Sequence, residues 1–161
     1  SDSARKARPT YKSTAGRMLY GGGAITPDLS VRPDTFTTAE QQLIRALAPK
    51  RAEYYVTLYD YGVQMKTQLK PDFQVAPAWR EELYGRLKKR GVEIDRAVWD
   101  AGQRYIDRDM ENRFARAAFG DSTARRRALP DDPPLQRAIA ILKSGPSTKE
   151  LIALAARPTT K

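Results

Sequence analysis

The residue types that could carry chemistry in this sequence are serines close to lysines. A Ser-Lys dyad hydrolyses peptides only when burial removes water from the lysine and lowers its pKa enough for it to act as a base. Ser13 follows Lys12 in a charged stretch, and Ser147 lies close to Lys149 at a predicted helix start. Nothing near either lysine would desolvate it, so we predict no catalytic residue in this chain.

A row of carboxylates, Asp107, Asp109 and Glu111, looks like a set of metal ligands. On a helix, however, residues two apart point about 200° away from each other, so these side chains cannot converge on one cation. The glycine that a calcium-binding loop needs is also missing. We therefore predict no metal site and no cofactor.

The amino-acid composition excludes further kinds of catalytic site and metal site. The 161 residues include no histidine and no cysteine, which excludes Ser-His-Asp and Cys-His sites, disulfides and thiolate metal sites within this chain. The net charge is +10, from 29 Lys and Arg against 19 Asp and Glu, and it favours anionic partners or surfaces. No apolar run reaches the length of about 18 residues that a membrane-spanning helix needs.

Three consecutive glycines mark the stretch GRMLYGGGAITPD. Gly16 and Gly21 have the spacing that opens a Walker A phosphate loop, but Gly22 and Gly23 stand where its lysine and hydroxyl should follow. Pro27 prevents a helix from beginning directly after the loop. The stretch therefore predicts a turn that leads into an extended segment rather than a nucleotide site.

Helix signals begin after Phe36. Thr37 and Glu40 have the spacing of a capping box, which places a helix start near Thr38. Further starts are expected at Pro77, Asp95, Asp131 to Pro134 and Ser147 with Glu150, and stops at Pro49, Gly91, Gly120 and Gly145. The predicted fold is mainly α, a multi-helix bundle of about five helices preceded by a short extended or β arm. We place the arm at residues 1–35 and the helical domain at 36–161.

The predicted core consists of apolar side chains at helical spacing: Trp79, Leu83, Leu87, Trp99, Ile106, Met110 and Phe114. Tyr55, Tyr59 and Val63 form a second stripe at four-residue spacing, which we expect to be buried together with Leu58, Met65 and Leu69. The alternative is that these tyrosines form a stacking platform for the bases of single-stranded nucleic acid.

Two basic stretches, Lys88 to Arg90 and Arg125 to Arg127, could contact phosphates. We expect the second stretch to link two helices. Carboxylates are interspersed through the same helices, a pattern typical of a solvated surface of mixed charge. Nucleic acid is therefore not the expected partner.

The glycine stretch resembles a segment of the carboxyl-terminal processing serine peptidases, also called tail-specific proteases. The resemblance rests on a turn motif made of Gly16, Arg17, Tyr20, Gly21, Gly22, Gly23, Ile25, Pro27 and Asp28, preceded by the run Tyr11 to Thr14. Ala24 stands where a further glycine is common in that family. The helical remainder is similar, more weakly, to the C-terminal extension that some bacterial members carry.

The resemblance implies a parent protein that cuts other proteins near their C-termini with a Ser-Lys dyad, usually after a PDZ domain, in the bacterial periplasm or cell envelope. This chain has no match to the nucleophile segment, the Gly-Lys-Gly segment of the base or a PDZ domain. We therefore expect a C-terminal piece of such a peptidase, in which the glycines turn at the edge of the protease sheet, Pro27 and Asp28 lead the chain out, and no motif residue is catalytic.

The resemblance implies two partners, the rest of the parent peptidase and, through that parent, protein substrates. We expect the arm in this piece to be either flexible or added as a strand to a second copy of the chain, because an unpaired strand edge binds further backbone. The helical region would pack on the protease core, gate substrate access or mediate oligomerisation. The alternative is a free basic helical module that binds nucleic acid or an anionic surface.

Overall fold

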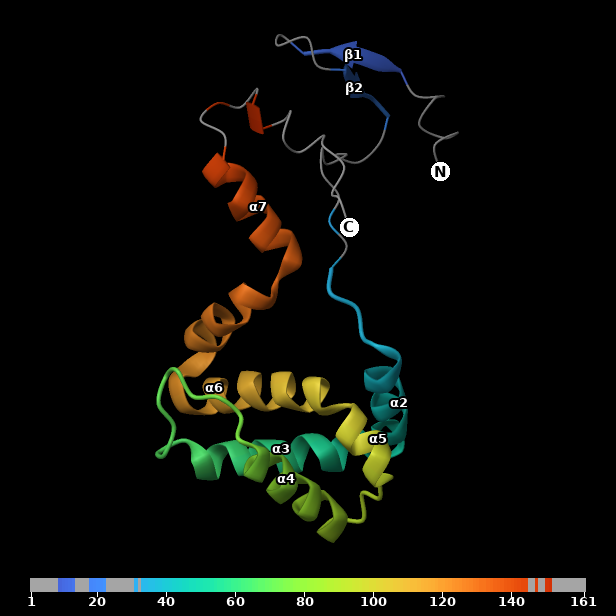
Figure 1. The fold of residues 1–161 in the computed structure, drawn as a ribbon, viewed down its shortest axis with the longest axis vertical. Helices are drawn as coiled ribbons and strands as arrows, with labels where there is room; N and C mark the ends of the chain where they lie inside the picture. The colour runs from blue at the N-terminus through green and yellow to red at the C-terminus, as the bar shows by residue number, and fades with distance from the viewer. Residues whose placement is uncertain are drawn as a thin grey trace. The chain divides into compact units, whose positions relative to one another are not determined.

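Helices form most of the chain that the structure, a computed structural model, describes (Figure 1). The described residues are 9–13, 18–22, 31, 33–144, 147 and 150–151. The elements are β1 (Thr10–Lys12), β2 (Met18–Tyr20), α2 (Thr38–Leu47), η1 (Ala48–Lys50), α3 (Arg51–Met65), α4 (Pro77–Lys89), α5 (Arg96–Ala101), α6 (Gln103–Ala128), η2 (Leu129–Asp131) and α7 (Pro133–Ser144). The predicted class, mainly α with a short β arm, is confirmed.

The chain divides into two units. One comprises residues 32–136, and the other comprises residues 1–31 together with 137–161. The boundary that the sequence suggests between residues 35 and 36 stays a prediction.

The predicted capping box opens α2. The backbone N–H of Thr37 donates to Glu40 Oε2 at 2.6 Å, and the backbone N–H of Glu40 donates to Thr37 Oγ1 at 3.2 Å. Such a cap is worth about 1 kcal/mol. Pro49 lies in the 3₁₀ turn η1, where the chain passes from α2 to α3, so the predicted break at Pro49 is also confirmed.

The predicted start and stop of α4 and the predicted cap of α5 are also confirmed. Pro77 is the first residue of α4, and Gly91 follows the helix with φ +72°, a left-handed conformation that favours glycine. The N–H of Val92 then donates to the carbonyl of Leu87 at 3.0 Å. Asp95 caps α5, since its carboxylate accepts from two backbone N–H groups in the first turn.

The single helix expected from Asp95 to Gly120 is interrupted at Gly102, which separates α5 from α6. The side chain of Leu43 lies so close that a Cβ on Gly102 would be 2.4 Å from Leu43 Cδ2. The break therefore lies where α2 packs against the junction of α5 and α6. The expected stop at Gly120 is present as a kink with φ 81° and ψ 173°.

Helical structure resumes after Gly120, so one expectation about the basic residues is wrong. Arg125 to Arg127 lie in the last turns of α6 rather than in a link between helices. Three positive side chains at a helix C-terminus interact favourably with the helix dipole.

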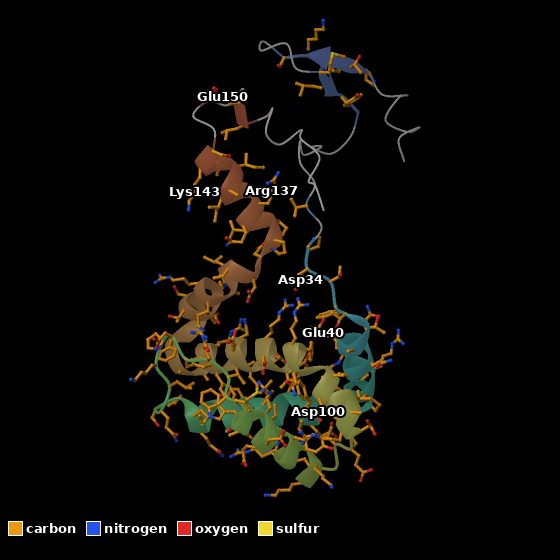
Figure 2. All side chains as sticks on the ribbon, viewed as in Figure 1. Asp34, Glu40, Asp100, Arg137, Lys143 and Glu150 are labelled. Atoms are coloured by element: carbon orange, nitrogen blue, oxygen red, sulfur yellow. The ribbon has the colours of Figure 1, made fainter. Side chains whose placement is uncertain are left out.

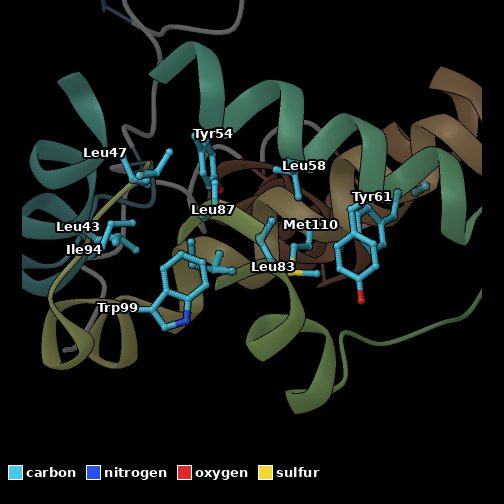
Figure 3. Packing of buried hydrophobic residues seen from close by; sticks show 14 of the residues in the cluster. Leu43, Leu47, Tyr54, Leu58, Tyr61, Leu83, Leu87, Ile94, Trp99 and Met110 are labelled. Atoms are coloured by element: carbon cyan, nitrogen blue, oxygen red, sulfur yellow. The ribbon is translucent and has the colours of Figure 1, made fainter. Parts of the chain in front are cut away.

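The core of residues 32–136 lies where α3 runs along α6, with α4 against both and α2 against α5 (Figures 1 and 3). The fully buried large side chains include Leu43, Tyr54, Leu58, Leu83, Leu87, Trp99, Ile106, Met110 and Phe114. The predicted core residues are all among the buried ones except Trp79, which is half-buried and packs beside the rings of Phe73 and Phe114.

The predicted buried face of α3 is confirmed at Leu58 and wrong at Tyr59 and Val63. Tyr59 is 63% exposed and Val63 39% exposed, whereas the side chains that point into the core are those of Tyr54, Leu58 and Tyr61 (Figure 3). Tyr55 is half-buried, and the guanidinium of Arg113 lies 4.3 Å from its ring centre. Helix α3 thus has two apolar rows, one with Tyr54, Leu58 and Tyr61 and the other with Tyr59 and Val63. The contacts of α3 with α4 and α6 decide which row is buried.

Helix α7 begins at Pro133, as expected, and Asp132 accepts the N–H of Leu135 at 3.0 Å. No side chain of α7 is buried, and Leu142 is 65% exposed. Ser147 and Glu150 exchange the two hydrogen bonds of the second predicted capping box, each 3.3 Å long. The rest of that predicted helix lies outside the described residues. Within the described part of the chain, every helix is too short or too polar to cross a membrane.

Candidate functional site

The turn motif that carries the resemblance overlaps a small hairpin. Strands β1 and β2 pair antiparallel, with Thr10 opposite Tyr20, Tyr11 opposite Leu19 and Lys12 opposite Met18. All six strand residues are exposed, although most of them are apolar or aromatic. Tyr11, for example, is 59% exposed. The hairpin therefore presents apolar side chains on both of its faces.

Three motif residues are described: Tyr20, Gly21 and Gly22. Tyr20 is the last residue of β2, and the N–H of Gly21 extends the pairing by donating to the carbonyl of Pro9 at 2.7 Å. A Cβ on Gly21 would lie 2.7 Å from Tyr11 Cε2, so only glycine lets the tyrosine ring lie there. Gly22 has φ +72°.

The other motif residues, Gly16, Arg17, Gly23, Ile25, Pro27 and Asp28, lie outside the described residues, as does most of the extended segment predicted to follow them. The described hairpin offers backbone groups and apolar side chains for recognition. A strand at the edge of a sheet pairs readily with a further strand, whether from a domain of the same protein or from a partner.

The row of carboxylates is divided among separate arginines. Asp107 accepts twice from Arg80 Nη1, at 2.9 and 3.1 Å, and Asp109 accepts from Arg113 Nε at 2.9 Å. Glu111 lies 3.8 Å from Arg127 Nη2. The three carboxylates thus point to three different neighbours, as the helical spacing predicts.

Of the two serine–lysine pairs, the structure describes Lys12, Ser13 and Ser147. Lys12 is exposed on β1, so water solvates its ammonium group. The hydroxyl of Ser147 accepts the N–H of Glu150 and serves as a helix cap, and Lys149 lies outside the described residues.

A cluster of phenols surrounds Asp109. Burial raises the pKa of Tyr54, and it raises the pKa of Tyr105 to about 12, with the charge of Asp109 adding to both shifts. Tyr105 and Asp109 also line a hollow of about 280 Å³ together with Phe36 and Arg127. Phenols with such high pKa values stay protonated at neutral pH and cannot serve as bases there.

Several basic side chains of the candidate phosphate-binding stretches have structural partners. Arg127 donates to the carbonyls of Pro71 and Phe73, each at 2.5 Å, and its guanidinium lies 4.3 Å from the ring centre of Phe73. Arg90 pairs with Asp60 at 2.6 Å. These contacts fix the α3–α4 connection and the surface of α4, and they reduce the charge available to an anionic partner.

Sequence reasoning missed one convergence of charges. Arg104 and Arg108 on α6 both donate to Oδ2 of Asp34, which lies in the segment before α2 (Figure 2). The spacing of the two arginines, i and i+4, places them on one face of a helix and could have drawn attention to the pair. The position of Asp34, 70 residues earlier than Arg104, carries no such signal.

The chain was compared with protein-family models, curated proteins and solved structures, and no match was found in any of the three comparisons.

Proposed function

We propose that this chain is the C-terminal, non-catalytic accessory region of a bacterial tail-specific serine protease. The parent would be a serine-type endopeptidase, and its compartment would be the periplasm or cell envelope. The observation that carries the proposal is the hairpin beside the family turn motif, whose six strand residues are all exposed.

Among the described residues, the hairpin consists of two strands of three residues each. A two-stranded sheet is marginal in water, because it needs a third strand or a packed face to become stable. Tyr11, Met18 and Leu19 are 59%, 48% and 40% exposed, so about half of their surface remains in contact with water. Joining the sheet of a protease domain would cover these side chains and add backbone hydrogen bonds along the strand edge.

The unit of residues 32–136, called the helical unit from here on, supports an accessory role. It has its own buried core, so it can be appended to another domain without sharing that domain's interior. Helix α7 also carries apolar side chains, such as Leu142, that it does not bury. Packing on the protease core, gating of substrate access and oligomerisation are the roles that such surfaces would serve.

The alternative, a module that binds nucleic acid, is supported by net charge alone. The structure ties Arg80, Arg86, Arg90, Arg96, Arg104, Arg108, Arg113, Arg116 and Arg127 to carboxylates. Binding to duplex DNA should therefore be weak, without sequence preference, and should decrease steeply as salt rises. Sequence-selective binding at physiological salt would favour the alternative.

The hairpin can be tested in the full-length gene product. Replacing Tyr11 and Leu19 with lysine should abolish proteolysis, or cut it at least tenfold, because charged side chains would oppose docking onto the protease sheet. Tyr59→Lys is a matched control, since it places a lysine at an exposed tyrosine of α3, which belongs to the other unit of the chain. Full activity of the Tyr11→Lys/Leu19→Lys variant, with the control also active, would contradict the proposal.

A further inference from the structure

One face of α3 carries a row of exposed apolar side chains. The row consists of Ala52, Val56, Tyr59 and Val63, and the three larger side chains are 50%, 63% and 39% exposed. The side chains that Figure 3 shows pointing from α3 into the core belong to the other row of this helix. We call the exposed row the α3 seam.

The spacing of the α3 seam matches a partner of helical shape. Its members follow one another at intervals of four, three and four residues, which are the intervals between the a and d positions of a coiled coil. The seam runs for about 16 Å along α3, which is about three helical turns. Apolar side chains at this spacing can interdigitate with those of a second helix that has the same spacing.

A groove runs beside the seam, between α3 and α4. Its volume is about 430 Å³, and it is lined from α3 by Tyr59 and Val63 and from α4 by Arg86, Lys89 and Arg90. The seam is therefore one wall of a groove, and side chains on the flank of a partner helix have a space to enter.

The border of the seam has an excess of positive charge. Arg86 and Arg90 each pair with a carboxylate, at 2.7 and 2.6 Å, so their charges are balanced. Lys66 follows Val63 by three residues and is exposed, and Lys89 is exposed in the groove. Within the described part of the chain, neither lysine has a carboxylate at ion-pair distance. Two unbalanced cations favour a partner that carries carboxylates beside its apolar row.

We propose that the α3 seam and its groove bind an amphipathic helix of a partner protein. The apolar row of that helix packs on the seam, and its flanking carboxylates pair with Lys66 and Lys89. Helices that bind in grooves use anchors at this spacing. The net charge of +10 also attracts an acidic partner during encounter.

The inference does not depend on the proposed function, because it uses only residues of the helical unit. The partner is a separate protein and takes no part in cleavage by the gene product alone. Tyr59→Lys therefore remains a valid control for the hairpin.

A lipid bilayer matches this face less well than a helix does. Glu53 and Asp60 also lie on the exposed side of α3, and their side chains are 38% and 42% exposed. An anionic bilayer would repel both carboxylates. Helices that bind in the membrane interface insert Trp, Phe or Leu, and the seam contains none of these residues.

The test uses the full chain and a synthetic helical peptide of three heptads. The peptide has leucine at positions a and d, glutamate at the flanking positions e and g, and alanine elsewhere. Repulsion between the glutamates keeps the peptide from pairing with itself. Titration followed by NMR should show binding of this acidic peptide, with the amide signals of α3 and α4 shifting. A second peptide, with every glutamate replaced by lysine, should bind about tenfold more weakly or not at all.

Val56→Lys separates apolar packing from charge. The variant adds a positive charge, so it would strengthen binding of the acidic peptide if charge alone decided the affinity. Because Val56 packs against the bound helix, we expect binding about tenfold weaker. Leu129→Lys is the matched control, since it adds the same charge at an apolar side chain that is 46% exposed and lies outside α3 and α4. Circular dichroism verifies that each variant is folded.

Lys89→Glu tests the charged border. It should weaken binding of the acidic peptide and strengthen binding of the lysine peptide. Lys88→Glu is its matched control, because it changes the net charge equally at the neighbouring residue, which does not line the groove.

Four results would overturn the inference: no binding of the acidic peptide, equal binding of the two peptides, equal effects of Val56→Lys and Leu129→Lys, or equal effects of Lys89→Glu and Lys88→Glu. Binding of anionic phospholipid vesicles in place of the peptide would assign the face to a membrane and overturn the helix assignment. Self-association of the unchanged chain that Val56→Lys removes would assign the seam to a second copy and overturn the choice of partner.

Discussion

Substituting Gly102 with alanine tests the packing of α2 against the junction of α5 and α6. The new Cβ would lie 2.4 Å from Leu43 Cδ2 and 2.9 Å from Leu43 Cβ, whereas carbon atoms in contact normally lie about 3.5–4.0 Å apart. The Cβ of Leu43 cannot move away by side-chain rotation, so α2 itself must shift. Leu43 is fully buried, which means that such a shift loosens the core.

The expected cost follows from two opposing terms. Overpacking a core typically costs about 1–3 kcal/mol. Replacing glycine by alanine returns about 0.4–1 kcal/mol through the lower entropy of the unfolded chain. We therefore expect Gly102→Ala to lower the free energy of unfolding by about 1–2 kcal/mol, measured by urea denaturation followed by helical circular dichroism.

Gly85→Ala supplies the matched control. Gly85 lies inside α4, and no atom lies within 4 Å of the position that its Cβ would take. Alanine should therefore stabilise the chain by about 0.5–1 kcal/mol through helix propensity. The reasoning would be refuted if the two variants changed the free energy of unfolding in the same direction and by the same amount.

Four further predictions concern the packing of Phe114, the contribution of residues 1–33 to stability, the pH dependence caused by Tyr105, and peptide hydrolysis. Phe114→Ala should lower the free energy of unfolding by about 3–5 kcal/mol, because Phe114 is fully buried beside Tyr61; a loss below 1 kcal/mol in urea denaturation would contradict that packing. Deleting residues 1–33 should leave the thermal melting of the helical unit nearly unchanged, and loss of helical circular dichroism would show that the arm belongs to the core. Stability should decrease as pH rises from about 10 to 12, because the unfolded chain loses the Tyr105 proton first, and Tyr105→Phe should flatten this decrease in denaturation curves. The isolated chain should hydrolyse no peptide, whereas turnover that survives repurification and disappears on mutating one of its serines would show a catalytic site.

Local signals in the sequence were sufficient to predict most helix boundaries. Thr37 with Glu40 and Asp95 cap helices through hydrogen bonds within a few residues of each other, so their effect is readable from spacing alone. Gly91 likewise ends α4 through its own backbone conformation. These features depend on neighbours in the chain, and the structure confirms them.

Features set by distant residues could not be predicted in the same way. Leu43, 59 residues earlier in the chain, packs against the break at Gly102, and contacts with α4 and α6 decide which of the two apolar rows of α3 is buried. Arg127 looked like part of a link, but it binds carbonyls more than 50 residues away, at Pro71 and Phe73. Periodicity shows that a row is apolar, and only tertiary contacts decide whether it is buried.

The candidate site also combines features that local sequence signals predict with features that depend on distant residues. The sequence identified the motif stretch, and the structure shows that Tyr11 lies over Gly21 in a hairpin. The convergence of Arg104 and Arg108 on Asp34 was not predicted, because pairing over such a sequence distance leaves no local pattern.

The central claim, that this chain is the C-terminal region of a tail-specific protease, is tested most directly by reading the coding sequence upstream of Ser1 and measuring the intact mass of the protein made by the native gene. The account predicts a continuous open frame that encodes a serine in a turn of small residues and a Gly-Lys-Gly segment, and a mass well above the 18.1 kDa of these 161 residues. A start codon immediately before Ser1, with a native product of about the mass of this chain, would contradict it.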